Sequence, residues 1–80
     1  MKSITVQGSF QNLKKVQNIY KAKVGNISDD AFTTIYEGTN EKGKLSGCIN
    51  SNYQEAGEKY LHQFRQSCLE IFPEDSLIEE

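Results

Sequence analysis

The only histidine of this 80-residue chain, His62, is the first residue whose side chain could do chemistry. Histidine changes its charge near neutral pH and often acts as a general acid or base. A catalytic histidine needs a neighbouring group that orients it. The carboxylate at helical spacing belongs to Glu58, four residues earlier, as in an ordinary surface pair on a helix. We therefore expect His62 to be a solvated helix residue, and we predict no catalytic residue and no enzymatic activity.

Two cysteines, Cys48 and Cys68, could form a redox pair, act as nucleophiles or bind a metal. A reactive thiol needs a cationic neighbour or a helix N-terminus that favours the thiolate, and the sequence places neither beside them. A structural zinc ion takes four ligands, whereas these cysteines and His62 supply only three, without CxxC or HxxxH spacing. We expect Cys68, on an apolar helix stripe, to be a core residue. We predict no metal site and no cofactor.

The net charge of −2 conceals a strong asymmetry along the chain. The first 24 residues contain five lysines and no acid, whereas the rest contain eleven acids and four bases. Lys14, Lys15 and Lys21 would share the polar face of a helix, which is the best nucleic-acid-binding feature of the sequence. The pI of about 5.4 argues against this use, because nucleic-acid-binding domains usually have a pI above about 9. Nucleic acid is therefore the less favoured partner.

The last twelve residues are acidic and contain no base. Such tails usually serve only to keep a chain soluble. A row of carboxylates can also imitate phosphates and occupy the nucleic-acid groove of another protein. The acidic candidates for partner binding are Glu74, Asp75, Glu79 and Glu80.

The elements that must position these residues follow from the hydrophobic periodicity. Residues 3–7 alternate between apolar and polar types, which predicts a short strand closed by Gly8. Ser9 is suited to cap a helix, and apolar residues recur at steps of three and four over 10–24. Gly25 can end this helix in the left-handed conformation.

A β-hairpin is the predicted structure of the middle of the chain. β-branched and aromatic residues fill 31–38, turn-forming residues follow, and alternation resumes over 43–50. The alternative is a short helix that starts at Ser28 and stops at Gly38, although consecutive Thr-Thr-Ile is poor helix material. Cys48 lies opposite the apolar strand face if the alternation is regular, or faces inward if a bulge precedes it.

The longest apolar stripe predicts a helix that starts after Asn52 and is ended by Pro73. Asn52 is a good N-cap, and Glu55 follows three residues later in a capping-box arrangement. A helix of about twenty residues would be about 30 Å long. Residues 74–80 then form either an extra edge strand or a short acidic tail. The predicted apolar face consists of Tyr53, Ala56, Gly57, Tyr60, Leu61, Phe64, Cys68 and Ile71.

The order strand, helix, strand, strand, helix predicts a single α+β domain over residues 1–80. The economical packing is a two-layer β-α-β-β-α arrangement, in which a three-stranded, mostly antiparallel sheet carries both helices on one face. One sheet face and two edges would then stay uncovered. An exposed edge must be protected or used, and its natural use is to pair with a partner strand.

We therefore predict a small, acidic, non-enzymatic protein-binding module, a regulator or inhibitor that acts through protein–protein contacts. The alternative is a nucleic-acid-binding domain that uses the lysine-rich helix over 10–24. In size and charge the chain is similar to accessory proteins of phages and mobile elements, and we expect a bacterial or phage origin.

The expected surroundings and partners follow from what the sequence lacks and from its aromatic residues. A secretory signal needs an apolar core of about 7–15 residues, and a membrane-spanning helix needs about 20. The sequence has neither, so we expect a cytoplasmic protein without membrane contact. The hairpin carries more apolar residues than two helices can cover, which predicts a homodimer. Tyrosine often anchors interfaces, and the candidate partner-binding tyrosines are Tyr20, Tyr36 and Tyr53.

Overall fold

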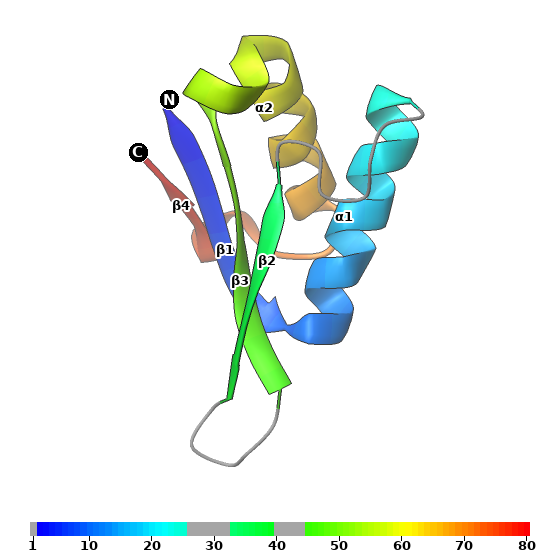
Figure 1. Cartoon of the computed structure of the whole chain (residues 1–80), viewed down its shortest axis with the longest axis vertical. Helices are drawn as coiled ribbons and strands as arrows, with labels where there is room; N and C mark the ends of the chain where they lie inside the picture. The colour runs from blue at the N-terminus through cyan, green and yellow to red at the C-terminus, as the bar shows by residue number, and fades with distance from the viewer. Residues whose placement is uncertain (1, 26–32, 40–44) are drawn as a thin grey trace.

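The structure, a computed structural model, describes residues 2–25, 33–39 and 45–80. It confirms the α+β fold, because two helices lie together on one side of an antiparallel sheet (Figure 1). The elements in chain order are β1 (Ser3–Ser9), α1 (Phe10–Val24), β2 (Thr34–Thr39), β3 (Leu45–Asn52), α2 (Tyr53–Leu69), the short 3₁₀ helix η1 (Glu74–Ser76) and β4 (Leu77–Glu79).

The sheet contains four strands in the order β2-β3-β1-β4, and each neighbouring pair is antiparallel. The prediction of three strands is therefore wrong by one. The chain reverses through Pro73 and η1, and Leu77–Glu79 returns along the free side of β1. Of the two predictions for residues 74–80, the extra edge strand is the one that the structure supports. Backbone pairing with β1 satisfies the hydrogen-bonding groups that a dangling tail would leave to water.

The predicted hairpin is present, since β2 and β3 pair in a continuous antiparallel register that places Tyr36 opposite Cys48. This strand excludes the alternative helix over its residues. The register contains no bulge, so Cys48 alternates regularly with its neighbours. The predicted beginning of the first strand of the hairpin (31–32), most of its turn (40–42) and the start of its second strand (43–44) lie outside the described residues.

Helix α1 begins and ends where the sequence predicts. The Ser9 hydroxyl oxygen accepts a hydrogen bond from the Asn12 N–H at 3.2 Å, which satisfies one of the free donors of the first turn. At the other end, the Gly25 N–H donates to the Lys21 carbonyl at 3.0 Å. Gly25 has φ 93°, a conformation that a residue with a Cβ avoids, so glycine suits this position.

Helix α2 is not the continuous rod that its apolar stripe predicts. Asn52 caps it as expected, because its side-chain oxygen accepts from the Glu55 N–H at 2.9 Å. Gly57, however, has φ 83° and ψ 167°, which breaks the helix after its first turn. Tyr53 lies on that first turn and is exposed, so it does not continue the buried stripe.

Helix α2 also ends earlier than predicted, at Leu69 rather than beside Pro73. The Cys68 carbonyl accepts the Phe72 N–H at 2.7 Å, and this turn carries Phe72 back across the end of β1. Ring carbons of Phe72 lie 2.7 and 2.8 Å from the place that a Cβ on Gly8 would occupy. Gly8 is therefore needed for close approach, but it does not end the strand as predicted, because β1 continues to Ser9.

The core lies between the two helices and the sheet. One row of residues crosses all four strands toward the helices: Ile35, Ile49, Val6 and Leu77. The rings of Tyr20 and Phe64 meet edge to face across the two helices, with centroids 5.8 Å apart. The helices contribute the buried residues Leu13, Val16, Tyr20, Leu61, Phe64 and Cys68.

Candidate protein-binding surface

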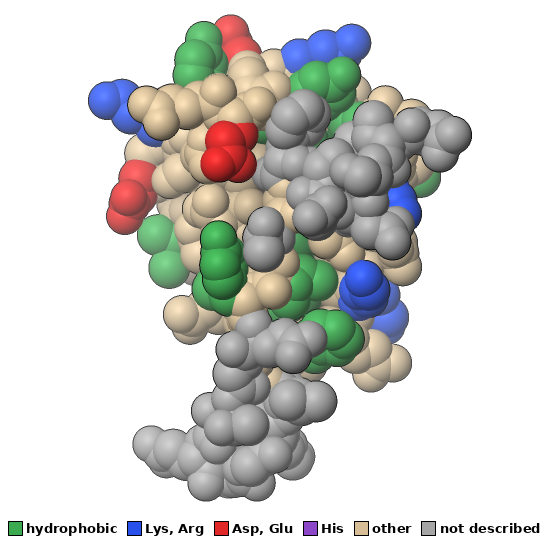
Figure 2. Space-filling view, viewed as in Figure 1, with side chains coloured by type: hydrophobic (Ala, Val, Ile, Leu, Met, Phe, Trp, Pro, Cys, Tyr) green, Lys and Arg blue, Asp and Glu red, His purple; other side chains and the backbone are tan. Residues whose placement is uncertain are grey.

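The face of the sheet that points away from the helices carries the alternate set of strand residues. Two rows of register neighbours cross it, and one of them joins Tyr36, Cys48 and Gln7. Figure 2 shows hydrophobic side chains on this side of the molecule among neutral polar ones, with acidic side chains in its upper part. We define the open face by its described residues Thr5, Gln7, Tyr36, Cys48, Asn50 and Ile78.

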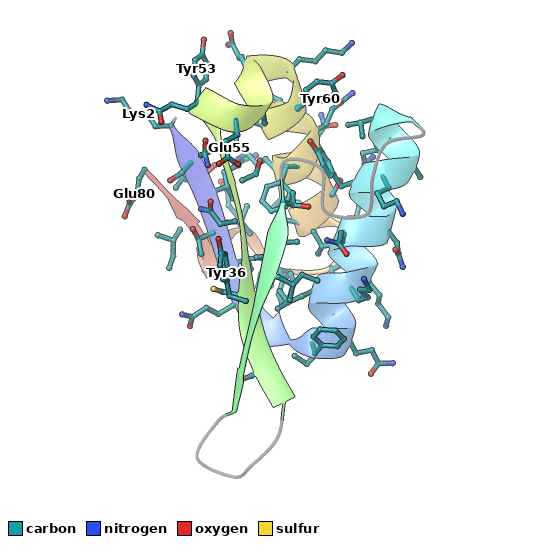
Figure 3. The ribbon with its side chains drawn as sticks, in the orientation of Figure 1. Lys2, Tyr36, Tyr53, Glu55, Tyr60 and Glu80 are labelled. Carbon is teal, nitrogen blue, oxygen red and sulfur yellow. The ribbon has the colours of Figure 1, made fainter. Side chains whose placement is uncertain are left out.

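Two large apolar side chains of the open face are strongly exposed. Tyr36 on β2 is 60% exposed and Ile78 on β4 is 51% exposed. Figure 3 shows the Tyr36 side chain on the side of the sheet away from the helices. Between them, the Asn50 side-chain amide donates to the Thr5 hydroxyl at 2.7 Å and to the Ile4 carbonyl at 3.2 Å. The centre of the open face is thus polar and internally bonded, with apolar groups at its two margins.

The direction of the backbone groups along each strand can be fixed from one end of the sheet. Ser3 and Glu80 exchange two N–H···O bonds of 3.0 Å, so Ser3 directs its backbone toward β4. Directions alternate residue by residue in an antiparallel ladder. Because the β1–β3 and β2–β3 pairings are continuous, the same alternation can be followed from Ser3 to β2. It directs the backbone N–H and C=O groups of Tyr36 toward β3. The N–H and C=O groups of Ile35, Glu37 and Thr39 therefore point away from the sheet, along the outer edge of β2.

The outer edge of β2 has little of the usual protection in its own sequence. The strand is six residues long and contains neither lysine nor proline, and Glu37 is its only charged residue. Natural edge strands are commonly short, charged or interrupted by proline, because a bare edge pairs with other chains. Within the described residues, β3 is the only strand that pairs with β2.

The opposite edge, β4, is short and fixed by ion pairs. Arg65 on α2 donates from Nε to Glu79 at 2.6 Å and from a terminal nitrogen to Glu74 at 3.1 Å. The Glu79 hydrogen bond is the main reason why the pKa of Arg65 lies above its usual range. Two of the four acidic candidates are thus engaged within the chain. Asp75 and Glu80 are exposed.

The three candidate tyrosines occupy different environments. Tyr36 lies on the open face. Tyr20 is fully buried against Phe64, and burial followed by the nearby Tyr60 raises its pKa to about 12, so in this fold it is a core residue that no partner can contact. Its hydroxyl has no hydrogen-bond partner among the described residues. Tyr53 is 50% exposed.

Tyr53 stands between two open depressions at one end of the molecule, near Lys2 and the C-terminal residue Glu80 (Figure 3). One of about 380 Å³ is lined by Lys2, Asn52, Tyr53 and Gln54. The other, of about 430 Å³, is lined by Tyr53, Glu58, Leu61 and His62. The second lining holds the only histidine of the sequence beside Glu58, whereas the first holds a lysine and two side-chain amides.

The candidate lysines lie on α1, away from the open face. Lys14 and Lys15 are exposed, and the Lys14 ammonium donates to the Gln17 side chain at 3.1 Å. Lys21 is half-buried. Lys23, one residue before the end of the helix, forms a 3.2 Å ion pair with Glu70. The basic surface of α1 is consequently narrower than the count of lysines suggests.

The candidate chemical groups lie in different environments. His62 and Glu58 form the expected surface pair at 3.8 Å, with both side chains largely exposed. Cys68 is buried, and desolvation raises its pKa to about 12, which keeps the thiol protonated at physiological pH. The described residues contain no group of three His, Cys, Asp or Glu side chains placed to hold a metal ion. No helix in the described ranges is both long and apolar enough to cross a bilayer.

Comparison of the chain with protein-family models, curated proteins and solved structures gave no match. The functional argument therefore rests on the surfaces themselves.

Proposed function

We propose that this protein is a non-enzymatic protein-binding module, a regulator or inhibitor whose partner contributes an extended segment that pairs with the outer edge of β2. The observation that carries the proposal is the outer edge of β2, which pairs with no strand among the described residues and lies beside the 60% exposed Tyr36. The outward N–H and C=O groups of β2 lie beside Tyr36, whose side chain belongs to the open face. Strand addition of this kind gives affinity through main-chain bonds and specificity through alternate side chains.

The composition of the open face supports a protein partner over a small molecule or an ion. Its two exposed apolar groups, Tyr36 and Ile78, are at opposite margins, with the hydrogen-bonded Asn50 between them. A flat surface with aromatic and amide groups is typical of protein contacts, whereas ligand sites are concave. The open-face set also contains neither lysine nor arginine, which a phosphate backbone would require.

The proposal is tested by placing a photo-crosslinking amino acid at position 36 of the full chain, in cells that naturally produce it. Position 15, exposed on α1, is the matched control. We expect a crosslinked protein from position 36 and none from position 15. Equal crosslinking from both positions, or none from position 36, would overturn the proposal.

Hydrogen exchange on the resulting complex tests the mode of binding. The amides of Ile35, Glu37 and Thr39 point outward and should gain protection when a partner strand pairs with them. The Tyr36 amide already points toward β3 and should change little. Protection of all four amides to the same degree would indicate a general stabilisation of β2 instead of strand addition.

The second candidate function is nucleic-acid binding through α1. It is favoured by the two exposed lysines Lys14 and Lys15 on a helix without acidic residues. The ion pair of Lys23 with Glu70 and the acidic pI weigh against it.

A further inference from the structure

We propose that the edge of β1 is a second strand-binding site, which β4 occupies within the chain and which also accepts an extended segment of a partner protein. The partner segment has an apolar residue at the position of Leu77 and a carboxylate at the position of Glu79. This site is at the opposite edge of the sheet from β2, so the inference does not depend on the proposed function (Figure 1). It follows from the way in which β4 is bound, because β4 shows what the edge accepts.

The main-chain part of the site consists of the backbone groups that β1 directs toward β4. Ser3 and Glu80 exchange two N–H···O bonds of 3.0 Å, and the register places Thr5 opposite Ile78, two residues further along. Because bonded pairs recur at every second residue of an antiparallel ladder, Thr5 and Ile78 form the next bonded pair. Any extended segment in this register can form the same bonds, whatever its side chains.

Two side chains of β4 define which segments fit the site. Leu77 lies opposite Val6 on the side of the helices, is 9% exposed and belongs to the core cluster. Glu79 lies on the same side, where its carboxylate accepts a 2.6 Å hydrogen bond from Arg65 Nε. Ile78, between them, is 51% exposed and imposes no requirement. The recognised pattern is therefore an apolar residue, then any residue, then an acidic residue.

β4 uses only part of the edge that β1 offers. β1 is seven residues long, and the register of β4 spans only Ile4–Val6. Gln7 directs its backbone groups to the same side as Thr5, but it has no strand neighbour there among the described residues. The chain that precedes β4 forms η1 instead of continuing the strand. A partner segment that is extended over this stretch gains main-chain bonds to Gln7 that β4 does not make.

The contacts that hold β4 in place are few. Of its three side chains, only Leu77 is buried. Arg65 supplies the ion pairs, to Glu79 and to the largely exposed Glu74 of η1, and such exposed pairs contribute little. The covalent link is the main advantage of β4, since it gives an effective concentration in the millimolar range. A separate segment that forms only the bonds of β4 therefore competes poorly, whereas one that also bonds to Gln7 can displace it.

The inference is tested with a fluorescent synthetic peptide, Thr-Thr-Thr-Leu-Ile-Glu-Glu, and the full chain. The peptide repeats residues 77–80 and has threonines, which favour strands, in place of the residues that form η1. We expect fluorescence anisotropy to give a dissociation constant below about 1 mM. The peptide with the natural sequence, Glu-Asp-Ser-Leu-Ile-Glu-Glu, should bind several-fold more weakly, because its first three residues favour the turn.

One side-chain change should have opposite effects in the chain and in the peptide. Glu79→Gln weakens the hold of β4 and leaves Arg65 to the peptide, which should then bind roughly three- to tenfold more tightly. Glutamine at the corresponding position of the peptide should weaken binding to the unmodified chain by a similar factor. Lys15→Gln, an exposed change on α1, is the control and should alter neither affinity. Circular dichroism checks that both variants are folded.

Hydrogen exchange locates the bound peptide. When the peptide replaces β4, the Gln7 amide should gain protection and the Ile78 amide should lose it, while the Thr5 amide stays paired. Absence of binding up to about 1 mM, binding without loss of protection at Ile78, or equal affinities of Glu79→Gln and the unmodified chain would overturn the inference. Protection of the Ile35 and Glu37 amides instead would also overturn it, but would support the proposed function of the β2 edge.

Discussion

The two edge strands of the sheet, β4 and β2, differ in how far they are protected from pairing with another chain. β4 is three residues long, follows a 3₁₀ turn and is held to α2 by Arg65 through Glu74 and Glu79. β2 is twice that length, carries a single charge and directs a regular row of backbone groups outward. Both edges belong to one antiparallel sheet, so the difference comes from local sequence and not from the type of sheet.

The comparison indicates that the acidic C-terminal segment protects one edge. We had expected the carboxylates of this segment to be candidates for contact with a partner. Two of them instead stabilise the strand that covers β1, and the protection of β4 makes the bare edge of β2 more conspicuous. An exposed edge that a protein leaves unprotected is the better candidate for an interface.

The largest expected loss of stability comes from removing a core side chain on which the sheet packs. Phe64 is fully buried beneath the sheet and against Tyr20, so Phe64→Ala should lower the free energy of unfolding by about 3–4 kcal/mol. Thermal melts should show little folded protein at 37 °C. Tyr53→Ala, on an exposed ring, is the control, and a similar melting temperature for both variants would show that the core is assigned wrongly.

A smaller loss of stability is expected from crowding the turn that leads to β4. The Gly8→Ala methyl group would collide with the Phe72 ring, which belongs to the turn that leads toward β4. Overpacking of this kind costs about 1–3 kcal/mol. Urea unfolding should show that loss, and adding Phe72→Leu should recover part of it. If the double variant is less stable than the sum of the single changes predicts, the contact is not the cause.

Alkaline pH should lower the stability of the core on which both edges depend. The pKa of Cys68 is about 12 in the folded protein, against an ordinary value near 9, so the unfolded chain loses this proton first. Stability is therefore complete below about pH 9 and falls as the pH rises from there toward about 12. Between pH 8 and 9.5, below the range in which the buried Tyr20 hydroxyl contributes appreciably, we expect a loss of about 1 kcal/mol in urea unfolding that Cys68→Ala largely lacks. Parallel losses in both proteins would contradict this assignment.

A local effect is expected when the protection of β4 is removed. Arg65→Gln eliminates both ion pairs, and the amides of Ser3 and Glu80, which join β1 to β4, should then exchange hydrogen faster. The amide of Tyr36, on the other edge, should be unchanged. Lys15→Gln, an exposed charge change on α1, is the control. Uniform acceleration across the sheet would show that Arg65 supports the entire fold and not this edge.

The smallest effect is expected from the lysines of α1. We expect no binding of duplex DNA or RNA at micromolar protein and physiological salt, and hence no change in Lys14→Glu with Lys15→Glu. A gel shift that weakens steeply with salt and disappears in this double variant would favour the nucleic-acid function over the protein-binding one.

The helix caps, the hairpin and the break in α2 were predictable from the sequence to different degrees. The caps at Ser9 and Asn52 and the hairpin were found from the sequence because each depends on residues within a few positions of one another. The break at Gly57 was missed because its spacing also fits an unbroken apolar stripe. A glycine in the first turns of a helix was the available signal.

The candidate surface was predicted only in part. The sequence indicated an uncovered sheet face, and it proposed Tyr36 together with Tyr20 and Tyr53. It could not distinguish a tyrosine that packs against Phe64 from one that faces water, because both types occur at apolar positions of amphipathic elements. Burial is decided by the neighbours that the fold supplies.

The sequence by itself determined the order of the elements, most of their boundaries and the residues that face the helices, because these depend on periodicity and on local hydrogen bonds. Only the tertiary structure decided that Leu77–Glu79 pairs with β1, that Arg65 gathers two distant carboxylates, and that the outward groups of β2 belong to Ile35, Glu37 and Thr39. These features join residues that are far apart along the chain, and their register depends on how the strands meet. No local sequence pattern specifies this strand register, because the packing of the whole core selects it.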